Sequence, residues 1–181
     1  MNTALLCTGT LYSSPFPSPL PSPFPNPLGC LALASHAGEL IGAWFVDARP
    51  ACTASWNVQP GMSPVLDQAV EELAEYFAGK RTRFDVPLGH RLGSSFCHAV
   101  WEQTRAIPYG TTIAYGALGK YIAKDGKACA PRAVAAALRA NPLLLFQPCH
   151  RVVYASGALS GYAAGTDRKA ALLRLESGLG I

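Results

Sequence analysis

The sequence predicts a two-domain α/β protein, in which a small domain of strands and one helix precedes a mostly helical domain. Three observations support this prediction. Two apolar segments flank a turn within residues 30–47, an amphipathic helix pattern follows, and capped helix patterns fill much of the second half. The charge also changes sign: residues 1–90 carry four Lys or Arg against seven Asp or Glu, and residues 91–181 carry eleven against four. We therefore expect one domain over residues 1–90 and another over residues 91–181.

The first domain contains a low-complexity Pro repeat over residues 14–28, SPFPSPLPSPFPNPL. Proline at every second place removes amide donors and fixes φ, so we expect an extended surface loop inserted into the domain. Residues 30–35 and 40–47 are predicted to be two strands around a turn at residues 36–38.

An amphipathic helix is predicted after Ser63, which is a suitable cap, with Pro64 in its first turn. Gly79 is expected to end this helix, before a basic linker that leads to the second domain. The apolar positions that recur at helical spacing are Leu66, Val70, Leu73 and Phe77.

The second domain is predicted to contain four helices. The first begins at Ser94 or Ser95 and ends before Ile107, and a short one spans residues 113–123. An Ala-rich helix over residues 132–140 follows after a polar link, and this pair resembles a helix-turn-helix. A final helix runs from about Asp167 to Ser177.

Composition limits the class of protein. Half of the 181 residues are hydrophobic and 14% are charged, which is typical of a folded globular chain. No apolar run approaches the roughly 20 residues of a membrane-spanning helix, and the first residues make a poor signal peptide. We expect a cytoplasmic protein without membrane contact. The basic second half suggests a polyanionic partner such as nucleic acid, and the alternative is a solvated basic face on an ordinary enzyme.

Six cysteines are present at irregular spacing, without a C-x-x-C pair or a zinc-finger pattern. We expect reduced thiols, no bound metal and no cofactor. A metal site assembled from dispersed residues is the alternative, and its candidate ligands would be Cys7, Cys30, His36 and His90.

The segment that carries chemistry is residues 141–153, where a Pro-Cys-His-Arg sequence at residues 148–151 interrupts two apolar runs. Polar groups between buried runs must find partners or serve a reaction. A lone cysteine is usually a small buried hydrophobe. Here two neighbours that can be cationic, His150 and Arg151, are expected to favour the thiolate of Cys149.

This segment resembles the 6-O-alkylguanine-DNA alkyltransferase family. The resemblance rests on PCHRVV after an Asn-Pro, on GYAAG and a last helix ending in Leu-Glu, and on FDVPL, FCHAVWEQTRAIPYGTTIAYGALG and RAVAAALRANP in order. It covers residues 80–181 strongly, and the first half only through NPLG-x-L-x-L and the helix before FAGK. It implies a ribonuclease H-like domain followed by a winged-helix domain with a helix-turn-helix.

The resemblance also implies an activity. A monomer without a cofactor would flip an alkylated guanine out of double-stranded DNA and take the alkyl group irreversibly onto Cys149, and activity on 4-O-alkylthymine is left open. His150 and Glu176 would activate Cys149 through a bound water, and Asn141 would brace the turn. The residues expected to contact DNA are Tyr115, Arg132, Arg139 and Arg151. The residues expected to line the base pocket are Tyr162, Ala163, Ala164 and Val152.

One departure from the family pattern concerns Ala164, which stands where the family usually has a glycine, so that its methyl group is expected to narrow the pocket.

Two other functions are considered. A helix-turn-helix regulator or lesion sensor would not need Cys149. A cysteine hydrolase would pair Cys149 with His150, but adjacent residues of an extended chain point to opposite faces.

Overall fold

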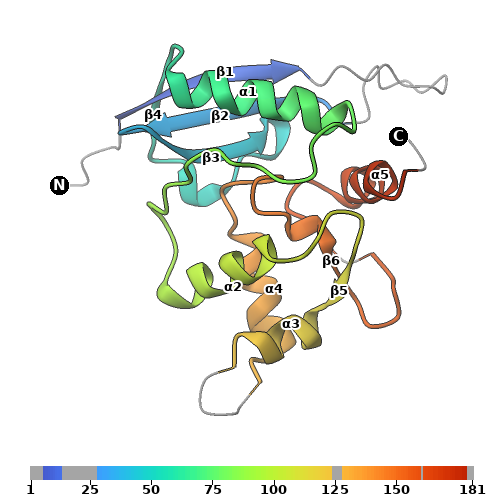
Figure 1. The fold of residues 1–181 in the computed structure, drawn as a ribbon. Helices are drawn as coiled ribbons and strands as arrows, with labels where there is room; N and C mark the ends of the chain where they lie inside the picture. The colour runs from blue at the N-terminus through green and yellow to red at the C-terminus, as the bar shows by residue number, and fades with distance from the viewer. Residues whose placement is uncertain (1–5, 14–27, 124–127, 160, 179–181) are drawn as a thin grey trace.

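The computed structural model describes residues 6–13, 28–123, 128–159 and 161–178. Within these ranges, no helix is both long enough and apolar enough to cross a membrane. The Pro repeat falls almost entirely on residues 14–27, outside the described residues, so the expected surface loop stays a prediction. The chain forms a sheet-and-helix half above a helical half, as Figure 1 shows, and the predicted fold class is confirmed.

A four-stranded sheet in the order β3-β2-β1-β4 forms the first half. β2 and β3 are the predicted hairpin, and Ala37 and Gly38 in its turn have φ of 50° and 79°, as a tight hairpin turn requires. β3 is shorter than predicted, because Val46–Ala48 turn into a 3-10 helix. The strands are β1 (Leu6–Ser13), β2 (Cys30–His36), β3 (Glu39–Phe45) and β4 (Asn57–Pro60).

The sequence prediction missed β1 and β4. These strands pair in parallel, and β1 also pairs with β2 across the Pro repeat. β4 has only four residues, mostly exposed, so its sequence carries no alternating pattern that could have predicted it. Long-range pairing, and not local periodicity, makes these two segments strands.

Helix α1 (Pro64–Phe77) packs on one face of the sheet (Figure 1), and the predicted start and end are confirmed. Ser63 is the N-cap residue, but its hydroxyl does not cap the helix by a hydrogen bond. Its Oγ lies 3.1 Å from Oγ of Ser35 on β2 instead, which ties the start of the helix to the sheet. Gly79, with φ of 70°, ends the helix turn as predicted.

The second half is helical. α2 is capped by Ser94, whose Oγ accepts a hydrogen bond from the amide of Cys97. Trp101 on α2 donates its indole N–H to the carbonyl of Ala137 over 2.8 Å, so α2 packs against α4. The helices are α2 (Ser95–Arg105), α3 (Tyr115–Tyr121), α4 (Pro131–Arg139) and α5 (Thr166–Glu176).

The helix predicted over residues 113–123 was wrong at its start. Ile113–Ala114 form strand β5, which pairs in parallel with β6 (Val152–Val153). The β-branched Ile113 suits a strand, and a partner 39 residues further along the chain decides the local structure.

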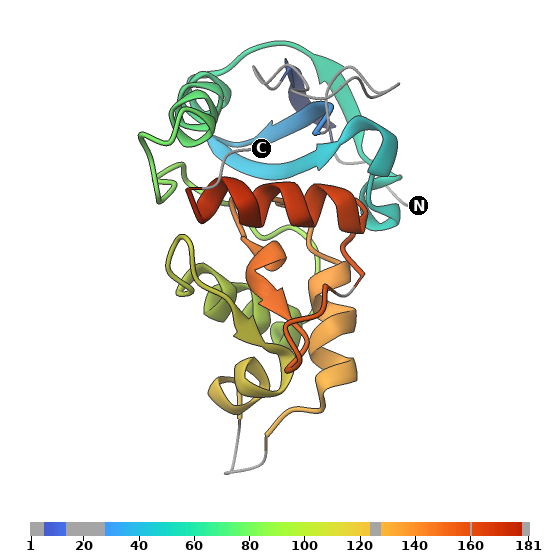
Figure 2. The same cartoon turned by 90° about the vertical axis from the view of Figure 1, so that its right-hand side faces the viewer.

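The edge of β3 joins the two halves. Ala43 on β3 donates its amide to the carbonyl of Pro142 and accepts from the amide of Leu144, each over 2.8 Å. Helix α5 lies between the sheet and the lower helices (Figure 2), and Arg168 at its start binds Asp47 and the carbonyl of Leu28. One continuous core spans both halves, and the Cys149 segment begins at their junction.

Candidate active site

The segment from Pro148 to Arg151 is buried and tightly turned. Cys149–Arg151 form a 3-10 turn, and the residues Cys149, His150 and Arg151 are 4%, 0% and 5% exposed. The expectation that Cys149 and His150 alternate along an extended chain was therefore wrong, because the chain becomes a strand only at Val152.

Asn141 holds the Cys149 turn from beneath. Its side-chain amide donates to the carbonyl of Gln147 over 2.9 Å and to Sγ of Cys149 over 3.3 Å. Its side-chain oxygen accepts from the amide of Leu143 over 2.9 Å. Leu145 between them has φ of 71°, a left-handed conformation that is rare for leucine and that this bonding holds in place. Asn141 thus fixes both the backbone of the loop and the position of the sulfur.

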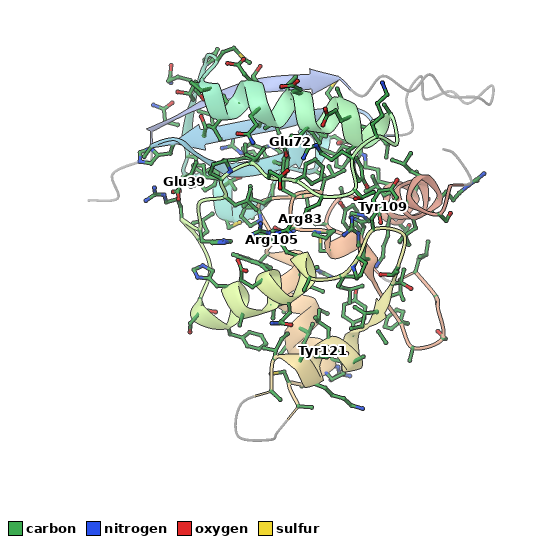
Figure 3. All side chains as sticks on the ribbon, in the orientation of Figure 1. Glu39, Glu72, Arg83, Arg105, Tyr109 and Tyr121 are labelled. Atoms are coloured by element: carbon green, nitrogen blue, oxygen red, sulfur yellow. The ribbon has the colours of Figure 1, made fainter. Side chains whose placement is uncertain are left out.

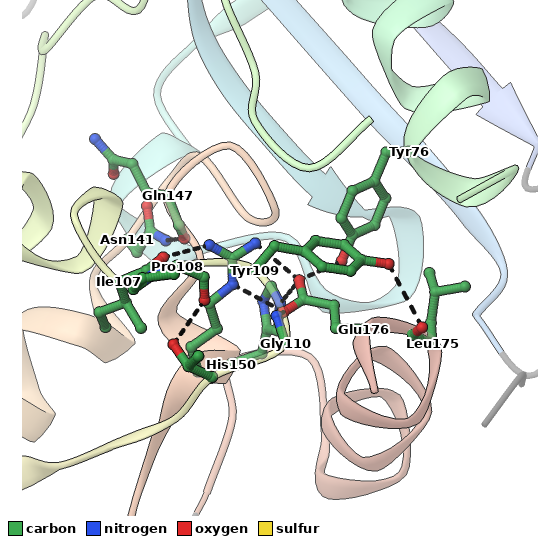
Figure 4. A network of polar contacts seen from close by, with 12 residues as sticks. Tyr76, Ile107, Pro108, Tyr109, Gly110, Asn141, Gln147, His150, Leu175 and Glu176 are labelled. Atoms are coloured by element: carbon green, nitrogen blue, oxygen red, sulfur yellow. Dashed lines mark hydrogen bonds and ion pairs between the residues drawn. The ribbon is translucent and has the colours of Figure 1, made fainter. Parts of the chain in front are cut away.

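Glu176 is the centre of a buried polar network, shown in Figure 4. Its Oε1 lies 2.9 Å from Nε2 of His150, and Arg151 binds both carboxylate oxygens over 2.9 Å. Tyr76 on α1 donates its hydroxyl to Oε1 over 2.7 Å, and the amide of Gly110 donates to Oε2 over 3.2 Å. One carboxylate therefore joins α1, the loop after α2, the Cys149 turn and α5.

The charges of this network follow from burial and pairing. Burial alone would raise the pKa of Glu176, but hydrogen bonds and charge from His150 and Arg151 outweigh it and lower the pKa to about 2. Burial lowers the pKa of His150 below its usual value, although Glu176 opposes this. At neutral pH the carboxylate is thus ionised, with the permanently charged Arg151 to balance it, and the imidazole is neutral.

Cys149 is a thiol in this arrangement. Burial raises its pKa to about 11, while the Asn141 amide and the charge of Lys169 act in the opposite direction. The expectation that His150 and Arg151 favour a thiolate was wrong, because both side chains point to Glu176 and not to the sulfur. Activation of Cys149 therefore requires a base that takes its proton.

Three buried side-chain polar atoms have no hydrogen-bond partner among the described residues: Oε1 of Gln147, Nδ1 of His150 and the hydroxyl of Tyr162. The two rings meet edge to face, with centroids 6.4 Å apart. Because Nε2 of His150 faces a carboxylate, it carries the ring proton, and Nδ1 is left as the basic nitrogen.

A narrow cavity of about 10 Å³ opens beside Cys149. Tyr115, Arg139, Tyr162 and Ala163 line it, as does Gly161. Its walls must separate before a purine base can enter. Arg132 lies outside this cavity, exposed in the first turn of α4, and Arg139 is exposed at the end of the same helix.

One predicted site residue, Arg151, is not where the prediction placed it. Arg151 was expected to contact DNA, but its guanidinium is buried against Glu176 and donates to the carbonyl of Ile107. Val152 and Ala164 were expected to line the base pocket. Both are buried and neither is part of the wall of the narrow cavity, which must open before a base enters, so their place in the pocket stays a prediction.

The alternative metal site is not assembled either. Cys30 and His36 stand at opposite ends of β2, and His90 lies beside Glu102 at 3.4 Å. The side chain of Cys7 lies outside the described residues, among which no group of three or more His, Cys, Asp or Glu could hold a metal ion.

A larger cavity of about 600 Å³ lies between Arg83, Arg105 and Tyr109, which Figure 3 labels. Its wall includes Arg151 but not Cys149. It touches the polar network from a side that the sulfur does not reach, so we assign no chemistry to it.

Two residues of the site escaped the sequence analysis. Tyr76 could not be found, because nothing in the pattern of α1 marks a contact with Glu176, a hundred residues further on. Lys169 is fully buried and donates to the carbonyl of Val152 over 2.6 Å. A signal for it existed, since Lys169, Leu172 and Glu176 share one helical face, so that two charged residues flank a core leucine.

Comparison with known proteins connects this geometry to one family. Residues 24–89 match the ribonuclease-like domain of 6-O-methylguanine DNA methyltransferase, and residues 95–178 match the DNA binding domain of the same family. A methylated-DNA–protein-cysteine methyltransferase of Mycobacterium bovis is 42% identical over 151 residues, which cover 82% of this chain and 87% of that protein.

Solved structures agree with these matches. The crystal structure of Mycobacterium tuberculosis OGT in complex with DNA is similar with a TM-score of 0.76 and 35% identity, over 97% of this chain and 95% of that one. An O6-methylguanine-DNA methyltransferase from Pyrococcus kodakaraensis is 22% identical, with a TM-score of 0.63 over 94% of this chain and 98% of that one, and shows the shared fold.

The buried ion pair between Arg151 and Glu176 is expected to stabilise the fold. We expect Arg151→Met to lower the free energy of unfolding by about 3–5 kcal/mol, because the buried Glu176 carboxylate loses the charge that balances it. Urea denaturation at pH 7 measures this loss. The matched control is Arg91→Met, which removes an exposed ion pair with Glu39 and should cost less than about 1 kcal/mol. Equal losses in both variants would show that the buried network does not stabilise the fold.

Proposed function

The chain belongs to the 6-O-methylguanine DNA methyltransferase family, and on that premise we propose that it repairs DNA by moving an alkyl group from the 6-oxygen of guanine onto Cys149. The observation that carries the proposal is a buried thiol, held by Asn141, beside a neutral histidine that a carboxylate orients. This arrangement can generate a nucleophile inside the protein without a metal or a cofactor.

The transfer is a displacement at the alkyl carbon. The sulfur of Cys149 forms a bond to that carbon as the bond from carbon to the guanine oxygen breaks, and the electron pair stays on the base. The thiol proton leaves the sulfur, and one proton reaches the departing base, so the products are a thioether and unmodified guanine. A thioether is not hydrolysed in water at neutral pH, and each molecule therefore acts once.

His150 supplies the base for this step. Its Nδ1 is buried and without a partner among the described residues, so a water molecule there can bridge it to the thiol of Cys149. When the imidazole takes the proton, the ionised Glu176 stabilises the resulting cation at Nε2. His150 touches the reacting group through water, while Glu176 and Asn141 act as positioning residues.

The leaving base needs a proton donor as well. The hydroxyl of Tyr162 is buried in the wall of the Cys149 cavity, and Tyr115 lines the same cavity. Burial raises the pKa of Tyr162 well above its usual value, so its hydroxyl keeps its proton and can donate a hydrogen bond to the base. Tyr115 is our proposed donor of the proton, and Tyr162 is proposed to orient the ring.

The DNA partner is double-stranded and contains an alkylated guanine. The 6-oxygen lies inside the duplex, so the nucleotide must rotate outward before it reaches Cys149. Arg132 is exposed at the start of α4, the second helix of the helix-turn-helix, and is proposed to fill the space that the base leaves. Arg139 at the other end of α4 is proposed to bind a phosphate group of the DNA. We propose that the protein acts as a monomer and in the cytoplasm.

The two alternative functions have less support. A sensor without transfer activity would not need the contacts that hold Cys149 and His150 in place. A hydrolase would need His150 in direct contact with the thiol, whereas the hydrogen bond that Cys149 accepts within the described chain comes from Asn141.

The nucleophile can be tested by mass. Incubation of the protein with duplex DNA that contains methylated guanine should add one methyl group, and digestion should locate it on Cys149. Cys149→Ser should bind the duplex but gain no mass, because a serine hydroxyl is not ionised at neutral pH. Cys97→Ser and Cys129→Ser, which change partly exposed thiols, should gain the methyl group normally. A methylated Cys149→Ser protein would show that the acceptor is another residue.

Base extrusion provides a second test. Arg132→Ala should slow transfer from methylated duplex DNA at least tenfold, because an inserted side chain offsets part of the few kcal/mol that unstacking costs. Transfer from free 6-O-benzylguanine base should stay within about twofold, since a free base needs no extrusion. Arg174→Ala, which changes an exposed arginine on α5, is the matched control. Equal slowing of both substrates in Arg132→Ala would contradict a role in extrusion.

A further inference from the structure

A second cavity adjoins the narrow one beside Cys149 and is larger, about 170 Å³. The two cavities share four wall residues, so they form one path from the surface of α4 toward the sulfur. These shared residues are Tyr115, Ala135, Arg139 and Gly161. The outer cavity adds Arg132 and Tyr154 to this wall.

Tyr154 is an exposed aromatic residue in an unusual place. Its ring lies 5.7 Å from the ring of Tyr115 at an interplanar angle of 53°, yet 54% of the residue remains exposed. Tyr115 is buried, so it supports one side of the Tyr154 ring and leaves the other side to solvent. A large ring held partly exposed at the mouth of a cavity is typical of a binding surface.

The backbone that carries this ring is held in a tight turn. Tyr154 follows strand β6 directly, and its amide donates to the carbonyl of Ala158 over 3.2 Å. Its carbonyl accepts from the amide of Gly157 over 2.9 Å, and Gly157 has φ of 78°, which suits glycine in a tight turn. The backbone of Tyr154 is therefore ordered before any ligand arrives, which reduces the conformational entropy lost on binding.

The charge around the cavity is positive. Arg132 and Arg139 contribute guanidinium groups to its wall, and none of the described residues of the wall carries a carboxylate. Neither arginine forms an ion pair with any residue of the described ranges. An aromatic face between two cationic groups fits one strand of nucleic acid, with stacking for the base and charge for the phosphates.

We propose that Tyr154 is the stacking platform of a binding site for the nucleobase next to the damaged guanine, in the same strand. The proposal rests on the proposed function, because the guanine must occupy the inner cavity. The shared wall leaves the outer cavity within reach of the adjoining nucleotide. Stacking reads no base identity, so the site supports binding to any sequence around the lesion.

The test uses the full chain with Cys149→Ser as the background for affinity, so that no transfer occurs during the measurement. Tyr154→Ala should weaken binding to a single-stranded oligonucleotide with one methylated guanine about tenfold, which corresponds to about 1.4 kcal/mol. Duplex DNA should show the same loss, since the stacked base lies in the damaged strand. Tyr154→Phe should bind like the parent protein, because stacking needs the ring and not the hydroxyl group.

Two controls make the result specific. Tyr121→Ala removes another exposed tyrosine, at the far end of α3 (Figure 3) and outside the cavity, and should leave affinity unchanged. With Cys149 intact, Tyr154→Ala should lose less of its rate with free 6-O-benzylguanine than with methylated DNA, and transfer from the free base also shows that the variant folds.

Unchanged affinity in Tyr154→Ala, or the same loss in Tyr121→Ala, would overturn the proposal. A loss with free benzylguanine as large as with DNA would also overturn it, since Tyr154 would then only support Tyr115. Failure of the proposed function is distinguishable, because the parent protein itself would then gain no methyl group from DNA.

Discussion

The structure depends on one buried carboxylate. Glu176 is ionised inside the protein, and burial of a charge is costly unless partners surround it. Its partners come from three segments far apart in the sequence, with Tyr76 from the first half and Gly110, His150 and Arg151 from the second. The need to satisfy this carboxylate therefore fixes α1, the loop after α2, the Cys149 turn and α5 relative to one another.

The same constraint prepares the chemistry. Because Arg151 balances Glu176 permanently, His150 does not have to be charged at rest and can act as a base. The thiol of Cys149 stays protonated in its buried position, which protects it from reaction with other electrophiles. The narrow cavity beside it must open for substrate, so we infer that Cys149 becomes reactive only when the alkylated base enters.

Local patterns in the sequence predicted the helices well, because α1, α2 and α4 have clear amphipathic periodicity, and α1 and α2 begin after serine N-cap residues. They failed where a distant partner decides the structure, as with β5, whose partner β6 lies far along the chain. The resemblance located Cys149, His150 and Glu176, but the sequence could not show that Arg151 turns inward. An arginine beside a reactive cysteine looks like a DNA contact until its buried carboxylate is known.

The central claim is that His150, held by Glu176, removes the proton from Cys149. The most direct test is the rate of Cys149 alkylation by free 6-O-benzylguanine between about pH 7 and 9.5, the range above the usual pKa of histidine. The lowered pKa of His150 keeps it neutral throughout this range, so the rate for the parent protein should be nearly flat. In His150→Gln, only the ionised thiol of Cys149 can react, and its pKa is about 11. The rate should therefore be lower than in the parent and rise about tenfold per pH unit. A parent rate that rises with the same slope as that of His150→Gln would contradict the account.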